Sequence, residues 1–73
     1  MKQPIVHKTY LKTWCIGKFY NYNLFEIDAG GNKWLEAVPI TKGVTRTANN
    51  EKELRVLLEH DAVAMNRFYQ KVR

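Results

Sequence analysis

The chain has 73 residues, of which 45% are hydrophobic and 12% aromatic, with a net charge of +5 and a single cysteine, Cys15. This composition is too apolar for a disordered segment, and one cysteine excludes a disulfide within the chain. No apolar run reaches the roughly 18 residues of a membrane span, and the first eight residues lack the apolar centre of a signal peptide. We therefore expect one complete small domain over residues 1–73, without a membrane segment and located in the cytoplasm.

The charges are unevenly distributed along the chain. Residues 1–25 and 62–73 contain Lys and Arg but no acid, and all seven acids lie between Glu26 and Asp61. Two basic ends favour an anionic partner. A net charge of magnitude about 2–8 is also what solubility requires of a small domain, so both interpretations stay open.

The first hairpin is predicted near the N-terminus. Residues 1–5 form a loose arm, because Pro4 disfavours a helix before it. Strand-forming residues fill Val6 to Ile16 and Phe19 to Ile27. Gly17-Lys18 between them is typical of a two-residue type II′ turn.

The second hairpin has the stronger turn signal. Residues 28–32 (DAGGN) place two glycines between Asp and Asn. A third strand follows from Lys33 to Val38 and ends at Pro39. Residues 44–47 form either a short fourth strand or a loop.

A helix is predicted in the last third of the chain. Asn50 is a good N-cap, Glu53 completes an Asn variant of the capping box, and Glu51 suits the positive end of the helix dipole. Asp61 interrupts the apolar stripe, so one long helix and two short ones are both open. The stripe consists of Leu54, Leu57, Leu58, Met65, Phe68, Tyr69 and Val72.

The order of these elements predicts an α+β domain. Its sheet is a three- to four-stranded antiparallel β-meander, and one C-terminal amphipathic helix, continuous or broken near Asp61, packs on it. Two-residue turns at Gly17-Lys18 and Gly30-Gly31 would set the register of the strands. The expected cross-strand pairs are Ile16 with Phe19, Trp14 with Asn21, Tyr10 with Phe25, and Ile27 with Trp34.

This register sorts the side chains into two faces. We expect the helix to cover the face that holds both tryptophans, with Lys8 and Lys12 at its rim. That face carries Tyr10, Trp14, Ile16, Phe19, Phe25, Ile27, Trp34 and Val38. The face expected to stay open carries Leu11, Cys15, Tyr20, Tyr22, Leu24, Leu35 and Ala37, with Thr9, Thr13 and Glu26.

Catalytic and metal-binding patterns are missing from the sequence. His7 and His60 lie in different elements, and neither has a Cys or an acid beside it at metal-ligand spacing. Cys15 falls in a strand pattern, where a buried, inert thiol is the usual case. No helix follows Gly30-Gly31, so that turn is not a phosphate loop. We expect no enzymatic activity, no metal and no cofactor.

Lysines alternate with aromatic residues between Lys8 and Tyr22. Proteins hold single-stranded nucleic acid with aromatic rings that stack on bases and with cations along the backbone, although sheets are rich in aromatics for structural reasons as well. The first hypothesis is a non-enzymatic module that binds RNA or single strands. Its binding residues would be Lys8, Lys12, Lys18, Tyr20, Tyr22, Lys42 and Arg46.

Two alternatives use the apolar part of the face expected to be open. An exposed patch of this kind usually marks an interaction site. One alternative is an inhibitor or adaptor that binds a host protein, and the other is a homodimer. Both would use Leu11, Tyr20, Tyr22, Leu24 and Leu35.

Two resemblances accompany these hypotheses. Three strands followed by a C-terminal helix resemble, in architecture, the arm-site DNA-binding domain of tyrosine integrases, which reads DNA with its sheet. The whole chain resembles the small accessory proteins of tailed bacteriophages in being short, basic, aromatic-rich and free of motifs. The second resemblance implies a host protein or RNA as partner, in the host cytoplasm.

Overall fold

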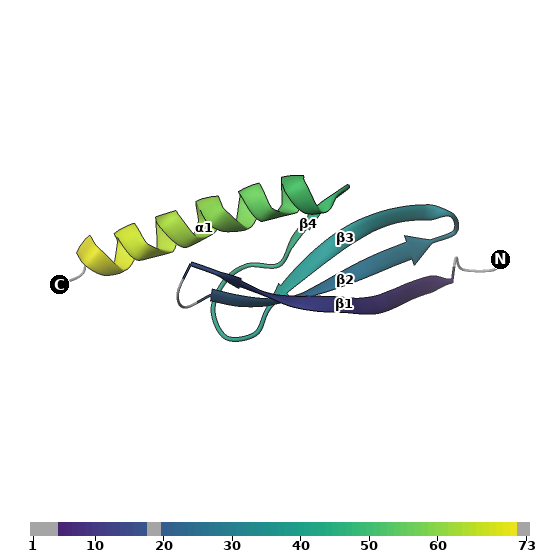
Figure 1. Cartoon of the computed structure of the whole chain (residues 1–73), viewed down its shortest axis with the longest axis horizontal. Coiled ribbons are helices and arrows are strands. Elements are labelled where there is room, and N and C mark those ends of the chain that lie inside the picture. The colour runs from purple at the N-terminus through teal and green to yellow at the C-terminus, as the bar shows by residue number, and fades with distance from the viewer. Residues whose placement is uncertain (1–4, 18–19, 72–73) are drawn as a thin grey trace.

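Four strands and one helix follow one another along the chain. The computed structural model describes residues 5–17 and 20–71, with the backbone alone for residues 66 and 68–71. The elements are β1 (Val6–Ile16), β2 (Tyr20–Ala29), β3 (Asn32–Pro39), β4 (Arg46–Ala48) and α1 (Glu51–Lys71). The strands form one antiparallel sheet in the order β1-β2-β3-β4, and α1 packs on one of its faces (Figure 1). The predicted α+β meander with a C-terminal helix is confirmed.

The second hairpin has the register that its turn predicts. Ile27 pairs with Trp34 and Ala29 with Asn32, which leaves Gly30-Gly31 as a two-residue turn. Both glycines have positive φ, +62° and +91°, as a type I′ turn requires. The Asp28 carboxylate accepts a hydrogen bond from the Gly31 N–H at 3.2 Å, so Asp28 also stabilises the turn.

The first hairpin is shifted by one residue from the prediction. Ile16 pairs with Tyr20 and Trp14 with Tyr22, so three residues separate the strands instead of two. Side chains alternate between faces along a strand, so this shift turns Trp14 and Ile16 to the face of the two tyrosines. The expected pairs of Ile16 with Phe19 and of Trp14 with Asn21 are wrong, while Lys18 and Phe19 lie outside the described residues.

A β-bulge at Leu11 compensates for the shift. The register changes between Tyr10, which pairs with Phe25, and Lys12, which pairs with Leu24. Leu11 is the extra residue, and beyond it the predicted pair of Tyr10 with Phe25 is confirmed. The two ends of β1 therefore alternate in opposite phase: Trp14 lies on one face of the sheet and Tyr10 on the other.

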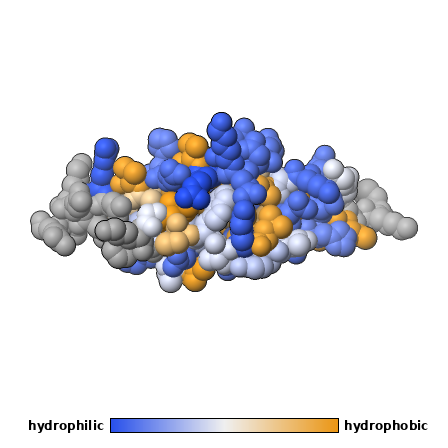
Figure 2. All heavy atoms as spheres, in the orientation of Figure 1, coloured by the Kyte–Doolittle hydropathy of each residue, from blue (hydrophilic) through white to orange (hydrophobic). Residues whose placement is uncertain are grey.

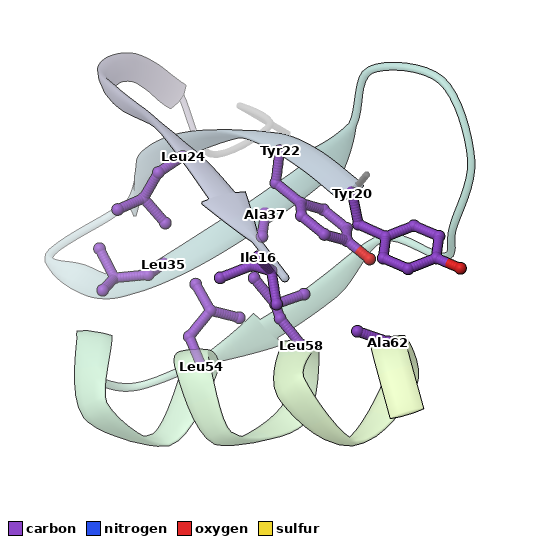
Figure 3. Packing of buried hydrophobic residues seen from close by; sticks show 9 residues of the cluster. All are labelled: Ile16, Tyr20, Tyr22, Leu24, Leu35, Ala37, Leu54, Leu58 and Ala62. Carbon is purple, nitrogen blue, oxygen red and sulfur yellow. The ribbon is translucent and has the colours of Figure 1, made fainter. Parts of the chain in front are cut away.

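The helix covers the face that we expected to be open. Tyr20, Tyr22 and Leu24 of β2 are buried against α1, together with Leu35 and Ala37 of β3 (Figure 3). From β1 only Ile16 and the partly buried Trp14 join this cluster. The rest of the predicted core, Tyr10, Phe25, Ile27, Trp34 and Val38, lies on the opposite face. The prediction of the buried face is wrong for these strands.

The helix begins as its sequence predicts and runs through Asp61 without a break. The Asn50 side chain accepts a hydrogen bond from the Glu53 N–H at 2.9 Å, which confirms the N-cap. Leu54, Leu58 and Ala62 form the buried stripe. The side chains of Phe68, Tyr69 and Val72 lie outside the described part of the chain. Among the described residues, no helix has the length and apolar character to cross a bilayer.

The helix and the sheet are offset along the longest axis of the molecule. The extents of the molecule along its three principal axes are 53 × 23 × 17 Å. In Figure 1, α1 lies over the end of the sheet near the β1–β2 connection, and its C-terminal end extends past it. The opposite end, which holds the β2–β3 turn, has no helix over it. The radius of gyration is 14.4 Å, against about 11 Å for a compact domain of this length. Much of the sheet is consequently left accessible.

Candidate functional site

The two tyrosines predicted to stack on bases are part of the core. Tyr20 and Tyr22 are 4% and 0% exposed, between the sheet and α1. A base can stack only on a ring whose flat face is open to solvent. These tyrosines therefore cannot form the predicted nucleic-acid surface in this fold.

Three of the predicted phosphate-binding cations are held by carboxylates. Lys8 pairs with Glu36 at 2.9 Å, Lys12 with Glu51, and Arg46 with Asp61 at 2.8 Å. A phosphate contact would have to compete with these pairs. Lys42 is exposed in the loop before β4, and Lys18 lies outside the described residues. Because the two tyrosines are buried, the seven residues predicted to bind nucleic acid do not form one surface.

The apolar patch predicted to bind a protein is likewise not a surface. Tyr20, Tyr22, Leu24 and Leu35 are all buried. Only Leu11, at the bulge of β1, is exposed. A partner or a second copy therefore cannot dock on this set without displacing α1.

The uncovered side of the sheet, here called the outer face, carries three rows of side chains across β1, β2 and β3. The rows follow from the strand register and the alternation of side chains. No element of the described chain covers this face. The rows are Lys8–Ile27–Trp34, Tyr10–Phe25–Glu36 and Thr13–Asn23–Val38.

Side-chain contacts hold the outer face in a defined arrangement. The rings of Tyr10 and Phe25 meet edge to face, with centroids 5.9 Å apart. The Thr13 hydroxyl donates to Asn23 at 2.9 Å and lies 2.7 Å from the Tyr10 hydroxyl. A hydroxyl has one proton, so Tyr10 is the donor in the second bond. Tyr10 is 56% exposed and nevertheless anchored at both its ring and its hydroxyl.

The charges of the outer face neutralise each other. The Lys8 ammonium lies 4.4 Å from the centre of the Phe25 ring and also pairs with Glu36. Ile27, between Lys8 and Trp34 in its row, is 5% exposed although no helix covers it. The face is therefore an aromatic and aliphatic surface with polar groups at one end and little net charge.

Trp34 also connects the outer face to a groove along β4 and the start of α1. The indole is half-buried, and the helix contributes the exposed side chains Val56 and Leu57. In Figure 2, hydrophobic residues form several patches between hydrophilic ones on the side facing the viewer. The groove is lined by Trp34, Thr47, Ala48, Asn49, Asn50, Lys52, Glu53, Val56 and Leu57.

On the covered side, a polar cluster joins β4 to α1. The Arg46 guanidinium donates two hydrogen bonds to the Asp61 carboxylate, at 2.8 and 2.9 Å, and this pair raises the pKa of Arg46. Burial, with the nearby charge of Asp61, raises the pKa of the Tyr22 phenol. The Tyr22 hydroxyl has no hydrogen-bond partner in the described part of the structure. Gly43 approaches it closely: a Cβ at that position would lie 2.8 Å from the hydroxyl oxygen. The cluster thus places Gly43 of the loop before β4 close to the Tyr22 ring.

Metal-ligating side chains are not gathered into a cluster in the described part of the chain. The described residues contain no group of three or more His, Cys, Asp or Glu side chains that could hold a metal ion. Cys15 is exposed, not buried as expected, and its thiol lies 3.7 Å from the Gly17 carbonyl.

One residue in the sequence agrees with the observed covered face, but it does not identify the outer face by itself. Ala is uncommon in strands, and Ala37 lies between Leu35 and Pro39 on β3. Ala37 is 0% exposed beneath α1. Ala29 of β2, however, lies in the phase of the outer face, so an alanine in a strand does not by itself mark the covered side. Trp34 and Val38, in the opposite phase to Ala37, lie on the outer face.

Comparisons with protein-family models, with curated proteins and with solved structures find no match to this chain. The resemblance to bacteriophage accessory proteins stays a prediction. Any function must therefore be argued from the surface itself.

Proposed function

We propose that the protein is a non-enzymatic binding module that recognises a partner protein through its outer face. The observation that supports this function is an uncovered sheet face on which aromatic rings are held by defined contacts. Exposed apolar patches with aromatic anchors are typical of protein interfaces.

The charge of the face favours a protein over a nucleic acid. Nucleic-acid affinity depends strongly on cations that are available to phosphates. The outer face has one lysine, Lys8, and its charge is matched by Glu36. Binding there would come from Tyr10, Phe25, Trp34 and Val38 through apolar contact and aromatic packing.

Nucleic-acid binding remains the second candidate because aromatic rings lie on three adjacent strands of a chain with net charge +5. This arrangement can stack bases. The two candidates differ in their response to salt: phosphate contacts weaken steeply as salt rises, whereas an apolar interface does not.

Affinity capture from an extract of the source cell tests both candidates. The immobilised wild type, Tyr10→Ala and the control Val44→Ala are compared, each with and without nuclease, at low and at high salt. Val44 is 59% exposed in the loop before β4, away from the three rows. We expect a captured protein that survives nuclease and high salt, is lost with Tyr10→Ala and is kept with Val44→Ala.

Two results would contradict the proposal. Capture that disappears with nuclease or high salt would identify the nucleic-acid candidate instead. Capture that is equal for Tyr10→Ala and wild type, with both variants folded by circular dichroism, would exclude the outer face as the site.

A further inference from the structure

The helix has a second stripe, apolar in part, on the side that faces away from the sheet. Val56, Leu57 and Val63 are 50%, 39% and 51% exposed. Val56, His60, Val63 and Arg67 recur at helical spacing and line a common hollow with Glu59. The buried stripe of Leu54, Leu58 and Ala62 lies on the other side of the same helix. Single exposed apolar residues are ordinary, but an apolar stripe on each side of a helix indicates two packing surfaces.

The far side of α1 is accessible over its described length. In Figure 1, no element lies over the helix on the side opposite the sheet. Val56 is shared between the hollow of this stripe and the groove beside Trp34. Val56 therefore borders both hollows, each of which also has polar side chains in its lining.

Opposite charges flank the stripe at its two ends. Glu53 lies near the start of α1 and Arg67 near its end, about 21 Å apart at 1.5 Å per residue. Both are exposed. Neither takes part in the ion pairs that the structure shows among its described residues. Each of these charges is therefore available to a partner.

This pattern is complementary to itself in one orientation only. In an antiparallel two-fold pair centred on His60, Glu53 of each copy faces Arg67 of the other, and Leu57 faces Val63. A parallel pair would place Glu53 beside Glu53 and Arg67 beside Arg67, which is unfavourable. A two-fold interface requires this self-complementarity.

We propose that two copies of the chain associate through this stripe, with their α1 helices packed antiparallel. The stripe is short, so the dimer forms in a concentration-dependent equilibrium with the monomer. This interface is distinct from the outer face, and the dimer presents two outer faces to partners. The dimer surface predicted from the sequence is instead buried beneath α1.

Sedimentation equilibrium of the full chain over a wide concentration range tests the proposal. We expect the average mass to rise from the 8.6 kDa of one chain toward twice that value. Val63→Lys should keep the chain monomeric, because it places a charge in the centre of the stripe. Val44→Lys makes the same substitution at a similarly exposed valine outside α1, and should dimerise as the wild type does.

A charge exchange tests the orientation. Glu53→Lys and Arg67→Glu should each raise the dimer dissociation constant about tenfold or more, because each creates like-charge contacts. The double variant restores opposite charges and should dimerise close to wild type. Circular dichroism verifies that each variant is folded.

Three results would overturn the proposal. The first is an average mass equal to that of one chain at every concentration. The second is equal dimerisation of Val63→Lys and Val44→Lys. The third is a double charge variant whose dimer dissociation constant is as high as that of its weaker-binding single variant.

Discussion

The two faces of the sheet carry similar numbers of large side chains and yet have opposite roles. On the covered face, Tyr22 and Leu24 pack against Leu54 and Leu58 of α1 and are fully buried. On the outer face, Tyr10 and Phe25 pack edge to face, and the Lys8 ammonium lies over the Phe25 ring. Substitutions on the covered face should therefore change stability. Substitutions of the exposed side chains of the outer face should change binding with little effect on stability.

The largest effect is expected from a matched pair of leucines on α1. Leu58 is fully buried and Leu57 is 39% exposed, although the two are adjacent. Leu58→Ala should lower the free energy of unfolding by about 2–5 kcal/mol, and Leu57→Ala by under about 1 kcal/mol. Urea denaturation measures both, and equal losses would contradict the assigned burial.

The next effect concerns the loop that closes over the covered face. Gly43 has φ +134°, and a Cβ there would lie 2.8 Å from the Tyr22 hydroxyl and 3.3 Å from the Pro39 Cβ. Gly43→Ala should cost about 2–4 kcal/mol from strain and overpacking. Gly30→Ala is the control, because its φ is also positive but no atom lies within 4 Å, and it should cost about 1–2 kcal/mol. A control that costs more than Gly43→Ala would exclude the close approach as the cause.

A smaller effect, of opposite sign, is expected at Tyr22. Its buried hydroxyl lacks a hydrogen-bond partner in the described structure, so Tyr22→Phe should be neutral or stabilising by up to about 1 kcal/mol. It should also reduce the cost of Gly43→Ala, which a double-mutant cycle measures. If Tyr22→Phe destabilises by more than 1 kcal/mol, the hydroxyl has a partner in solution.

The same substitution changes the response to alkaline pH. Burial raises the pKa of Tyr22 above its ordinary value of 10.0, so the folded state favours the neutral phenol. The stability that comes from burying the neutral Tyr22 phenol is complete below about pH 10. It is lost as the pH rises through the pKa that Tyr22 has in the folded state. Tyr22→Phe should therefore retain more of its stability above pH 10 than the wild type, as measured by urea denaturation across that range.

The smallest effect is expected on the outer face. The Lys8–Glu36 pair joins side chains that are 49% and 23% exposed, so Glu36→Gln should cost about 0.2–1 kcal/mol. Thermal unfolding at low and at high salt measures the change, which should shrink as salt rises. If Glu36→Gln lowered the free energy of unfolding as much as Leu58→Ala, the outer face would stabilise the fold as a second core does.

Local signals in the sequence predicted several features of the fold correctly. The glycine pair at the β2–β3 turn determined the register from Ile27 to Trp34, because a two-residue turn with two positive φ angles allows few alternatives. Asn50 determined the start of α1 through its own side chain. Asp61 does not break the helix. Its carboxylate is bound by Arg46 from β4, a residue fifteen positions away in the sequence.

The candidate site could not be predicted in the same way. Its location depended on one additional residue in the first hairpin and on a compensating bulge at Leu11, neither of which the side-chain pattern reveals. The bulge and the additional turn residue each shift the alternation of side chains along β1 by one position. The residues of β1 between Leu11 and the turn therefore lie on the face opposite to the predicted one. The predicted register placed Trp14 and Ile16 on the opposite face, so Tyr20 and Tyr22 were assigned to a binding surface although they belong to the core.

The sequence by itself determined the α+β class, both ends of β1, the second turn and the beginning of the helix, because each depends on the conformational preferences of a few neighbouring residues. Only the tertiary structure decided which face α1 covers, because both faces of the sheet are apolar enough to be buried. The helix packs on the face that holds Ala37, Leu24 and Leu35. That selection leaves Tyr10, Phe25 and Trp34 uncovered on the outer face, where we propose the binding site.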